Sequence, residues 1–196
     1  RLSFPLIVKS QSEHASVGIA QASVVDSDEK LVERVAFIHE RIGTDAIAEQ
    51  YIEGRELYVG VLGNDRLTAL PVWELEFGDL PDHARHIATA RVKHDPAYQE
   101  RRGILQGPAE ELSPEGRARI RALSRRIYRV LELDGYARID FRYAANGDVY
   151  FLEANPNPEI ARTEEFASAA LHAGIEYSDL LHRILKLGLR RGPGPA

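Results

Sequence analysis

The stretch GYARIDFRYAANGDVYFLEANPNP, residues 135–158, decides the fold, because it reads as two strands joined by a tight turn. Its Asn-Gly dipeptide is typical of a β-hairpin turn, and apolar residues flank it on both sides. Side chains alternate between the two faces of a strand, so Arg138 and Asp140 share one face of the first strand. Glu153 and Asn155 likewise share one face of the second strand. If the turn pairs the strands, Asp140 lies opposite the region of Glu153.

The polar side chains of this hairpin form a candidate metal site. Carboxylate and amide oxygens are ligands that suit Mg²⁺ or Mn²⁺, so we expect Asp140, Glu153 and Asn155 to bind such an ion. The alternative interpretation is a polar face that is simply exposed to water. Apolar neighbours favour the metal site, because they indicate that one face of the hairpin is buried while the other gathers polar groups. These neighbours are Ile139, Phe141, Phe151 and Leu152.

Residues 4–77 predict one helix among several strands. The segment DSDEKLVERVAFIHERIG (26–43) reads as a helix, because apolar residues share one face and acidic residues begin it. A small, polar loop (10–20) precedes this helix. The remaining segments are predicted strands: FPLIVK (4–9), AIAEQYI (46–52), RELYVGVLGN (55–64) and RLTALPVWELEF (66–77).

The clearest helix of the chain is SPEGRARIRALSRRIYRVLELDG (113–135). Ser113 is a suitable N-cap, and Pro114 suits the first helical position. Apolar residues at helical spacing predict the stripe that faces the core. They are Ile120, Leu123, Ile127 and Val130.

Two further regions complete the pattern. Residues 78–110 show no sustained period and read as one long loop, of a length that often forms a functional lid. Near the end of the chain, TEEFASAALHAG (163–174) and SDLLHRILKLG (178–188) predict two closing helices. The whole pattern is that of an α+β protein, in which helices pack on antiparallel hairpins.

Composition excludes several classes of function. The chain has no cysteine, which rules out a disulfide framework, a thiolate zinc site and a cysteine nucleophile. A net charge of -5 argues against a general nucleic-acid binder. Neither a membrane span nor a leader peptide is evident, so the cytoplasm is the expected location.

The ends of the chain suggest a larger polypeptide. The sequence contains no methionine and enters a predicted strand almost at once. We therefore expect this chain to be a piece of a longer protein, with an upstream domain missing. Residues 191–196 read as a disordered tail. The sequence is compatible with a homodimer but does not predict one.

Five motifs, taken in order, resemble the ATP-grasp superfamily, and most of all the ATP-binding portion of D-alanine–D-alanine ligases and related carboxylate-amine ligases. The motifs are FPLIVK, EQYIEGRE, LPVWE, GYARIDFR and FLEANPNP. The resemblance implies an α+β ATP-grasp fold, with two lobes of largely antiparallel sheet and a nucleotide bound between them. Residues 1–55 would then form part of a small lobe, and residues 56–190 the large lobe.

The same resemblance implies an ATP-dependent ligase with ATP and two Mg²⁺ ions, or Mn²⁺, as cofactors. A carboxylate would be activated as an acyl-phosphate, which an amine or amino acid then attacks to give an amide. Asp140, Glu153 and Asn155 are the implied metal ligands. Arg138 would steady the acyl-phosphate and the tetrahedral intermediate, and Lys93 would reach the γ-phosphate from a flexible lid. The implied partners are small molecules, with neither nucleic acid nor membrane.

Family roles in nucleotide binding fall on residues earlier in the chain. Glu49 and Gln50 would meet adenine, Ile52 would line the base pocket, and Glu56 would hold the ribose hydroxyls. Asn157, after the hairpin, is a plausible further contact.

The resemblance also implies two contacts to the phosphates of the nucleotide, one from a lysine and one from a loop. Lys9 corresponds to a lysine that contacts the α- and β-phosphates, and Ser16, Val17 and Gly18 resemble a loop whose backbone N–H groups cradle phosphate oxygens. From the residues alone, Lys9 could equally extend from a strand edge into solvent, and the loop could be a polar turn without a ligand. Arg55, within the adenine motif, is interpreted as part of a solvated turn.

The sequence departs from the D-alanine ligases directly after the hairpin. Glu159 stands where those enzymes have a glycine that helps to bind the oxyanion, so we expect another carboxylate and amine as substrates. The alternative is a non-catalytic ATP-binding module with a sensing or interaction role. A third possibility is a metal-dependent phosphoryl-transfer enzyme outside the superfamily. The scattered histidines His83, His86 and His94 do not predict a transition-metal site.

Overall fold

The computed structural model describes residues 2–13, 16–81 and 84–191. It divides into two compact units, Arg1–Glu53 with Phe77–Leu105, and Gly54–Glu76 with Gln106–Ala196. Each unit combines antiparallel strands with helices, which confirms the predicted α+β class. The sequence-based division at residue 55 assigns 77–105 to the second lobe, whereas the structure groups these residues with the first unit. Of the predicted tail, residues 192–196 lie outside the described residues.

The first unit contains a small antiparallel sheet in the order β2-β1-β3. Its strands are β1 (Leu6–Ser10), β2 (Val24–Val25) and β3 (Ala46–Gln50). A short 3-10 turn (Gln21–Ser23) leads into β2, and helix α1 (Asp28–Phe37) continues into a π-helical turn (Ile38–Ile42). Ser27 caps α1 and Gly43 follows the turn in a left-handed conformation, so the predicted helix is confirmed. Its apolar face packs on β1 around Leu6, Val8, Val25 and Ile38.

The rest of the first unit corrects the prediction of a long loop over residues 78–110. Two short helices form there, α2 (Ala90–His94) and α3 (Pro96–Arg102), and strand β7 (Leu105–Pro108), which follows them, belongs to the sheet of the second unit. Thr89 and Asp95 cap the two helices through side-chain oxygens, at 3.3 Å and 2.9 Å from the backbone nitrogens that they accept from. The helices are too short to show a sustained apolar period, but their caps are present in the sequence.

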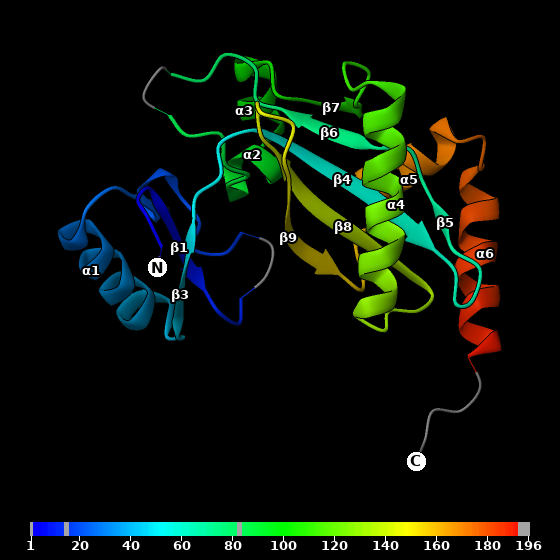
Figure 1. Ribbon diagram of the computed structural model, residues 1–196, viewed down its shortest axis with the longest axis horizontal. Coiled ribbons are helices and arrows are strands. Elements are labelled where there is room, and N and C mark those ends of the chain that lie inside the picture. Colours follow the sequence, from blue (N-terminus) through cyan, green and yellow to red (C-terminus); the bar gives the residue numbers. More distant parts are fainter. Residues whose placement is uncertain (1, 14–15, 82–83, 192–196) are drawn as a thin grey trace. The chain divides into compact units, whose positions relative to one another are not determined.

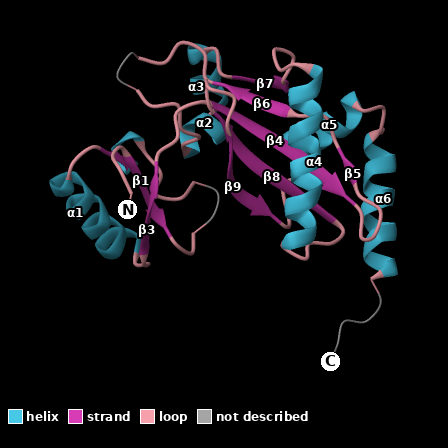
Figure 2. Ribbon diagram, viewed as in Figure 1, coloured by secondary structure: helices cyan, strands magenta, loops and turns pink. Residues whose placement is uncertain are grey.

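The second unit is built on a six-stranded antiparallel sheet, in which β7-β6-β4-β8-β9 form one path and β5 pairs with β4. Figure 1 shows helix α4 lying across this sheet, and Figure 2 shows its strands in magenta. The strands are β4 (Arg55–Leu62), β5 (Thr68–Ala69), β6 (Trp73–Glu76), β8 (Tyr136–Tyr143) and β9 (Val149–Asn155). The helices are α4 (Pro114–Val130), α5 (Glu165–His172) and α6 (Tyr177–Arg190).

One face of this sheet packs against α4, and we call it the α4 face. It is apolar throughout its centre, where Val59, Ile139 and Phe141 are fully buried against Ile120 and its neighbours. Ser113 caps α4 as predicted, its Oγ accepting from the backbone N–H of Gly116 at 3.0 Å. The predicted core stripe is wrong at one position, because Val130 is 73% exposed at the last turn of the helix.

Two predictions for β4 to β6 also need correction. The segment 66–77 forms two short strands rather than one, and residues 70–72, which include a proline, separate them. Arg55 does not lie in a solvated turn. It opens β4, and its guanidinium makes two hydrogen bonds with the buried Glu74 carboxylate, at 2.6 Å and 2.5 Å. Within the described part of the chain, no helix is both long and apolar enough to cross a bilayer.

Candidate functional site

The face of the sheet opposite α4 carries the polar residues of the hairpin, and we call it the polar face. Arg142 and Asp140 of β8 lie opposite Glu56 and Tyr58 of β4 in the strand register. On the other side of β8, Asp140 lies opposite Glu153, and Arg138 opposite Asn155. The predicted pairing of the two carboxylates is therefore confirmed.

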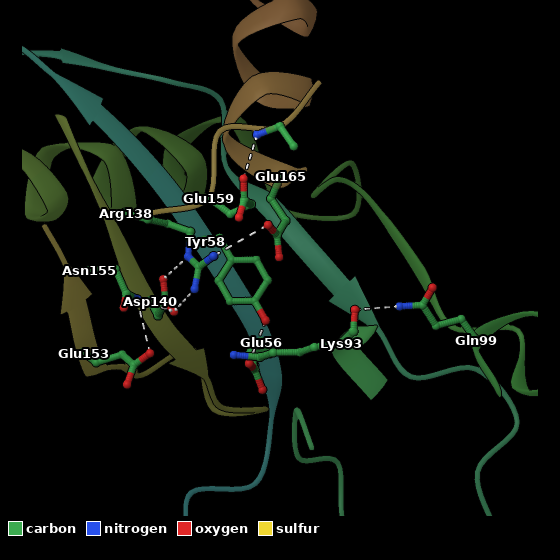
Figure 3. A network of polar contacts seen from close by, with 11 residues as sticks. Glu56, Tyr58, Lys93, Gln99, Arg138, Asp140, Glu153, Asn155, Glu159 and Glu165 are labelled. Carbon is green, nitrogen blue, oxygen red and sulfur yellow. Dashed lines mark hydrogen bonds and ion pairs between the residues drawn. The ribbon is translucent and has the colours of Figure 1, made fainter. Parts of the chain in front are cut away.

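The three predicted metal ligands meet in one small volume (Figure 3). The Asn155 amide nitrogen lies 3.3 Å from Oδ2 of Asp140 and 3.2 Å from Oε1 of Glu153, and it donates a hydrogen bond to each. Asp140 is buried, Asn155 is half-buried and Glu153 is exposed. The site thus has a buried inner carboxylate and an outer one that solvent reaches.

A β-bulge lies beside these residues. Asp140 pairs with Glu153, but Phe141 pairs with Phe151, so Leu152 is an extra residue in β9. Bulges re-aim side chains and are frequent next to active sites. The expectation that Phe151 belongs to a buried face is wrong, because this side chain is 45% exposed, and Leu152 is only half-buried.

Arg138 is held between two acidic side chains. Its Nε and Nη2 donate to the two oxygens of Asp140 at 2.8 Å and 2.9 Å, and its Nη1 lies 3.6 Å from Oε2 of Glu165 (Figure 3). The guanidinium lies over the ring of Tyr58, 4.8 Å from its centre. Burial opposes the charged form, but Asp140 and then Glu165 outweigh it and raise the pKa of Arg138. Arg138 is therefore a permanent, oriented positive charge.

Sequence reasoning missed part of this network. Tyr58 donates a 2.7 Å hydrogen bond to Oε1 of Glu56, its neighbour on the polar face of β4. Burial, and next to it the negative charge of Glu56, raises the pKa of the Tyr58 phenol well above its usual value. Arg142 forms an ion pair with Glu56, and Glu165 comes from the first turn of α5. Arg142 was detectable, because it shares the alternation that places Arg138 and Asp140 on one face. Glu165 was not, because its position depends on tertiary packing.

The donor atoms of the site fit a hard divalent cation. Two carboxylates and a carboxamide offer oxygen ligands of the kind that Mg²⁺ takes. Asn155 would have to present its oxygen rather than its nitrogen, a rotation of the amide about its terminal bond. No group of three or more histidine, aspartate or glutamate side chains suited to a metal occurs among residues 2–13, 16–81 and 84–191. Any cation here would thus take water or substrate oxygens as its remaining ligands.

The predicted nucleotide residues of the first unit gather partly on its small sheet. Lys9 and Glu49 project from the face of β1 and β3 that is opposite the buried Val8, because the register pairs Lys9 with Ile47 and Ile7 with Glu49. Nζ of Lys9 lies 2.6 Å from Oε2 of Glu49. Both side chains remain partly exposed, which leaves them accessible to a ligand.

The predicted phosphate loop is shaped by two hydrogen bonds of its own unit. Ser16 has a positive φ of 61°, and its Oγ donates to the carbonyl of Ala88 at 2.7 Å. The buried Arg34 guanidinium donates to the Gly18 carbonyl, which fixes the end of the loop. Val17 between them is 44% exposed. Residues 14–15 of this predicted loop lie outside the described residues.

The remaining predicted residues are spread over several elements. Gln50 ends β3 and is exposed, and Ile52, two residues further along the chain, is half-buried. Lys93 lies in α2 rather than in an irregular lid, and its backbone carbonyl accepts from Gln99 at 3.2 Å. Asn157 is exposed and accepts a 2.5 Å hydrogen bond from the Tyr136 hydroxyl.

Glu159 and the histidines complete the comparison with the sequence predictions. A carboxylate oxygen of Glu159 accepts from the backbone N–H of Ala161 at 3.1 Å, so this side chain folds back on its own loop (Figure 3). The ring of His86 stacks on Phe77 at 5.1 Å. His83 and the side chain of His94 lie outside the described residues.

Comparison with known proteins gives one consistent result. A family model described as "D-ala D-ala ligase C-terminus" matches residues 1–186. A D-alanine–D-alanine ligase of Desulfotalea psychrophila is 32% identical over 98% of this chain and 56% of that protein. An uncharacterized protein of Sinorhizobium fredii, y4sG, is also 32% identical, over 97% of this chain and 54% of its own length. The chain spans about half the length of the curated relatives that it matches.

Solved structures agree on the fold. A crystal structure of the D-alanine–D-alanine ligase from Bacillus anthracis complexed with ATP superposes with a TM-score of 0.71 and 25% sequence identity, over 95% of this chain and 53% of that one. A second structure of the Bacillus anthracis ligase reaches a TM-score of 0.74. The predicted ATP-grasp architecture is therefore confirmed.

Proposed function

Because the chain belongs to the family of D-Ala-D-Ala ligase C-terminal domains, we propose that it is the ATP-using part of a carboxylate-amine ligase. In this proposal a carboxylate oxygen attacks the γ-phosphorus of ATP and releases ADP, and an amine then displaces phosphate from the acyl-phosphate to give an amide. The observation that carries the proposal is the meeting of Asp140, Glu153 and Asn155 beside the partly buried Arg138.

Magnesium supplies charge neutralisation of the phosphates when it is bound. Asp140, Glu153 and Asn155 would hold it, and two ions are the number that the family resemblance implies, with Mn²⁺ as a substitute. Asp140 already pairs with Arg138, so a bound cation would share this carboxylate with the guanidinium. The inner position of Asp140 and the exposed position of Glu153 leave room for water and phosphate oxygens on the outer side.

Arg138 would stabilise negative charge that develops on the acyl group. A preoriented cation in a water-poor environment needs no reorganisation when that charge appears, and such groups are often the largest contributors to catalysis. Asp140 and Glu165 fix the guanidinium in place. We propose that Lys93 of α2 contacts the γ-phosphate, as its counterpart does in the family.

The other nucleotide contacts follow the sequence resemblance. Lys9 would bind the α- and β-phosphates, and the backbone of residues 16–18 would cover them. Adenine and ribose would contact residues of β3 and β4 and the segment between them. These residues are Glu49, Gln50, Ile52 and Glu56, and Asn157 is a further candidate contact.

The substrates are expected to differ from a pair of D-alanines. Glu159 adds a carboxylate where the D-alanine ligases have a glycine, and its backbone-bonded position removes the freedom that a glycine would give this loop. The alternative of a non-catalytic ATP-binding module has no support from the relatives. A phosphate-release assay with a panel of carboxylates and amines separates the two functions, because a module that only binds ATP stays silent with every substrate.

Calorimetric titration with ATP tests the nucleotide half of this proposal. We expect binding in the presence of Mg²⁺ that is lost with a chelator, and a loss of affinity of about 100-fold or more in Asp140→Asn, since even residues that only support a metal ligand contribute 10–100-fold. Asp148→Asn removes the same charge from the exposed turn of the same hairpin and should bind like the wild type. Absence of both heat and thermal stabilisation with Mg²⁺ and ATP would end the proposal.

A further inference from the structure

The ion pair between Arg142 and Glu56 is the one with the lowest combined side-chain exposure in the described part of the chain. Nη2 of Arg142 lies 2.8 Å from Oε2 of Glu56, and the two side chains are only 6% and 7% exposed. Nη1 of Arg142 donates to the backbone carbonyl of Gly54 at 2.9 Å. Tyr58 donates to the other oxygen of Glu56. Glu56 is thus held at both oxygens, and Arg142 is itself tied to the backbone before β4.

This arrangement fixes Glu56 without using its full capacity to accept hydrogen bonds. A carboxylate has about four acceptor positions, and the contacts from Tyr58 and Arg142 occupy two of them. Strand β4 is otherwise almost entirely apolar and buried. Replacing a buried ion pair by well-packed hydrophobic residues is often neutral or stabilising, so stability alone is a weak reason for the pair.

A second arginine–glutamate pair on the same strand provides an internal comparison. Arg55 immediately precedes Glu56 and forms two hydrogen bonds with Glu74 on the opposite face of the sheet. Arg55 is about a quarter exposed, with its side chain 28% accessible, and none of its partners is a predicted nucleotide contact. The chemistry of the two pairs is the same, while their faces and their burial differ.

We propose that Arg142 is a positioning residue, which orients the Glu56 carboxylate toward the ribose hydroxyls of the nucleotide and so sets a preference for ribonucleotides over deoxyribonucleotides. The inference rests on the proposed function, because contact between Glu56 and ribose is part of it. The planar guanidinium binds Glu56 and the Gly54 carbonyl through two nitrogens of one rigid group, a geometry that a lysine does not reproduce.

The test is the ratio of the dissociation constants of 2′-deoxyATP and ATP, measured by calorimetry with Mg²⁺ on the same protein sample. This ratio does not depend on the fraction of folded protein. We expect the wild type to favour ATP by about 10-fold or more, as for one hydrogen bond to a charged group. In Arg142→Lys and Arg142→Gln the preference should fall to within about 3-fold, with the affinity for 2′-deoxyATP nearly unchanged.

Three controls make the possible outcomes distinct. Arg55→Lys on the opposite face should lower the melting temperature while it keeps the preference for ATP. The double variant Glu56→Leu, Arg142→Met removes both charges and should fold, and it should lose the preference. Tyr58→Phe removes the second donor to Glu56 without leaving a charge unpaired, and it should also weaken the preference for ATP. This variant replaces Arg142→Gln as the test if Arg142→Gln does not fold.

Each outcome has one meaning. If both Arg142 variants keep the wild-type preference and the double variant loses it, the role of Arg142 is disproved while the ribose contact of Glu56 stands. If the double variant keeps the preference, Glu56 does not contact ribose and that part of the proposed function fails as well. Equal losses for ATP and 2′-deoxyATP in Arg142→Lys would mean a purely structural role and would also overturn the inference.

Discussion

The two faces of the sheet in the second unit are made from the same strands but are built in opposite ways. On the α4 face, alternate residues of β8 such as Ile139 and Phe141 are fully buried and apolar. On the polar face, the residues between them are Arg138, Asp140 and Arg142, and each is engaged with a group of opposite charge. The sequence ARIDFR therefore encodes a hydrophobic core and an ionic network at once.

The difference between the faces shows what each contributes. Apolar burial on the α4 face supplies stability in proportion to area and needs no exact geometry. Buried charges on the polar face stabilise little in net terms, because desolvation offsets their attraction, but they fix directions. Stability and function are thus expected to separate by face, and substitutions can test that separation.

The largest effect is expected from Phe141→Ala on the α4 face. This side chain is completely buried, so its removal should cost about 3–5 kcal/mol of unfolding free energy. Chemical denaturation monitored by circular dichroism measures this loss. Affinity for Mg²⁺ and ATP, measured where the variant is still folded, should stay within a few-fold of wild type.

Phe151→Ala is the matched control for this prediction. Phe151 lies opposite Phe141 in the strand register but is 45% exposed, so its truncation should cost less than about 1 kcal/mol. A tenfold or greater loss of nucleotide affinity in folded Phe141→Ala would show that the two faces are not independent.

The sequence predicted the part of the fold that local patterns determine. The hairpin and the pairing of Asp140 with Glu153 followed from strand alternation and an Asn-Gly turn. The bulge at Leu152 could not be predicted in this way, because one inserted residue is not visible in an alternating pattern. For the same reason the exposure of Phe151 was mispredicted.

Other parts of the structure depend on contacts that a linear pattern does not contain. Helices α2 and α3 are too short to show a period, although Thr89, Asp95 and Gly103 marked their ends. Glu165 reaches Arg138 only because α5 packs on the sheet. Arg142, by contrast, is predictable from the sequence, because it is the third polar residue, after Arg138 and Asp140, in the same strand alternation.

A medium effect is expected where α5 closely approaches the polar face. A Cβ added to Gly60 would lie 2.7 Å from Leu70 Cδ1 and 2.8 Å from Phe166 Cε2. Gly60→Ala should therefore cost about 1–3 kcal/mol of unfolding free energy through overpacking. Thermal denaturation measures the loss. The close approach means that α5 limits space on the polar face, and the variant should also weaken the hold of Glu165 on Arg138.

Gly107→Ala in β7 is the control for crowding, since a Cβ there meets nothing within 4 Å. Its stability should stay near that of the wild type. Combining Gly60→Ala with Leu70→Val and Phe166→Leu should restore part of the loss. If Gly60→Ala alone is as stable as Gly107→Ala, α5 moves freely and does not constrain the polar face.

The smallest effects concern two buried tyrosines, one on each face. Tyr58 donates to the Glu56 carboxylate, whereas Tyr128 of α4 donates to the Gly63 carbonyl at 2.9 Å. Burial is the main cause that raises the pKa of both phenols. Each folded phenol keeps its proton above about pH 10, where an unfolded tyrosine ionises, so stability is intact below that pH and falls as pH rises beyond it.

Replacement by phenylalanine should cost about 1 kcal/mol at neutral pH at either position. Both variants should lose less stability than the wild type between about pH 9 and 11, as melting temperatures over that range would reveal. The two variants should differ in their affinity for the nucleotide. Only Tyr58→Phe should change this affinity, because it frees one oxygen of Glu56. Equal nucleotide affinities in the two variants would mean that the hydroxyl of Tyr58 supports only the fold. The functional difference between the faces would then come from the charged residues of the polar face alone.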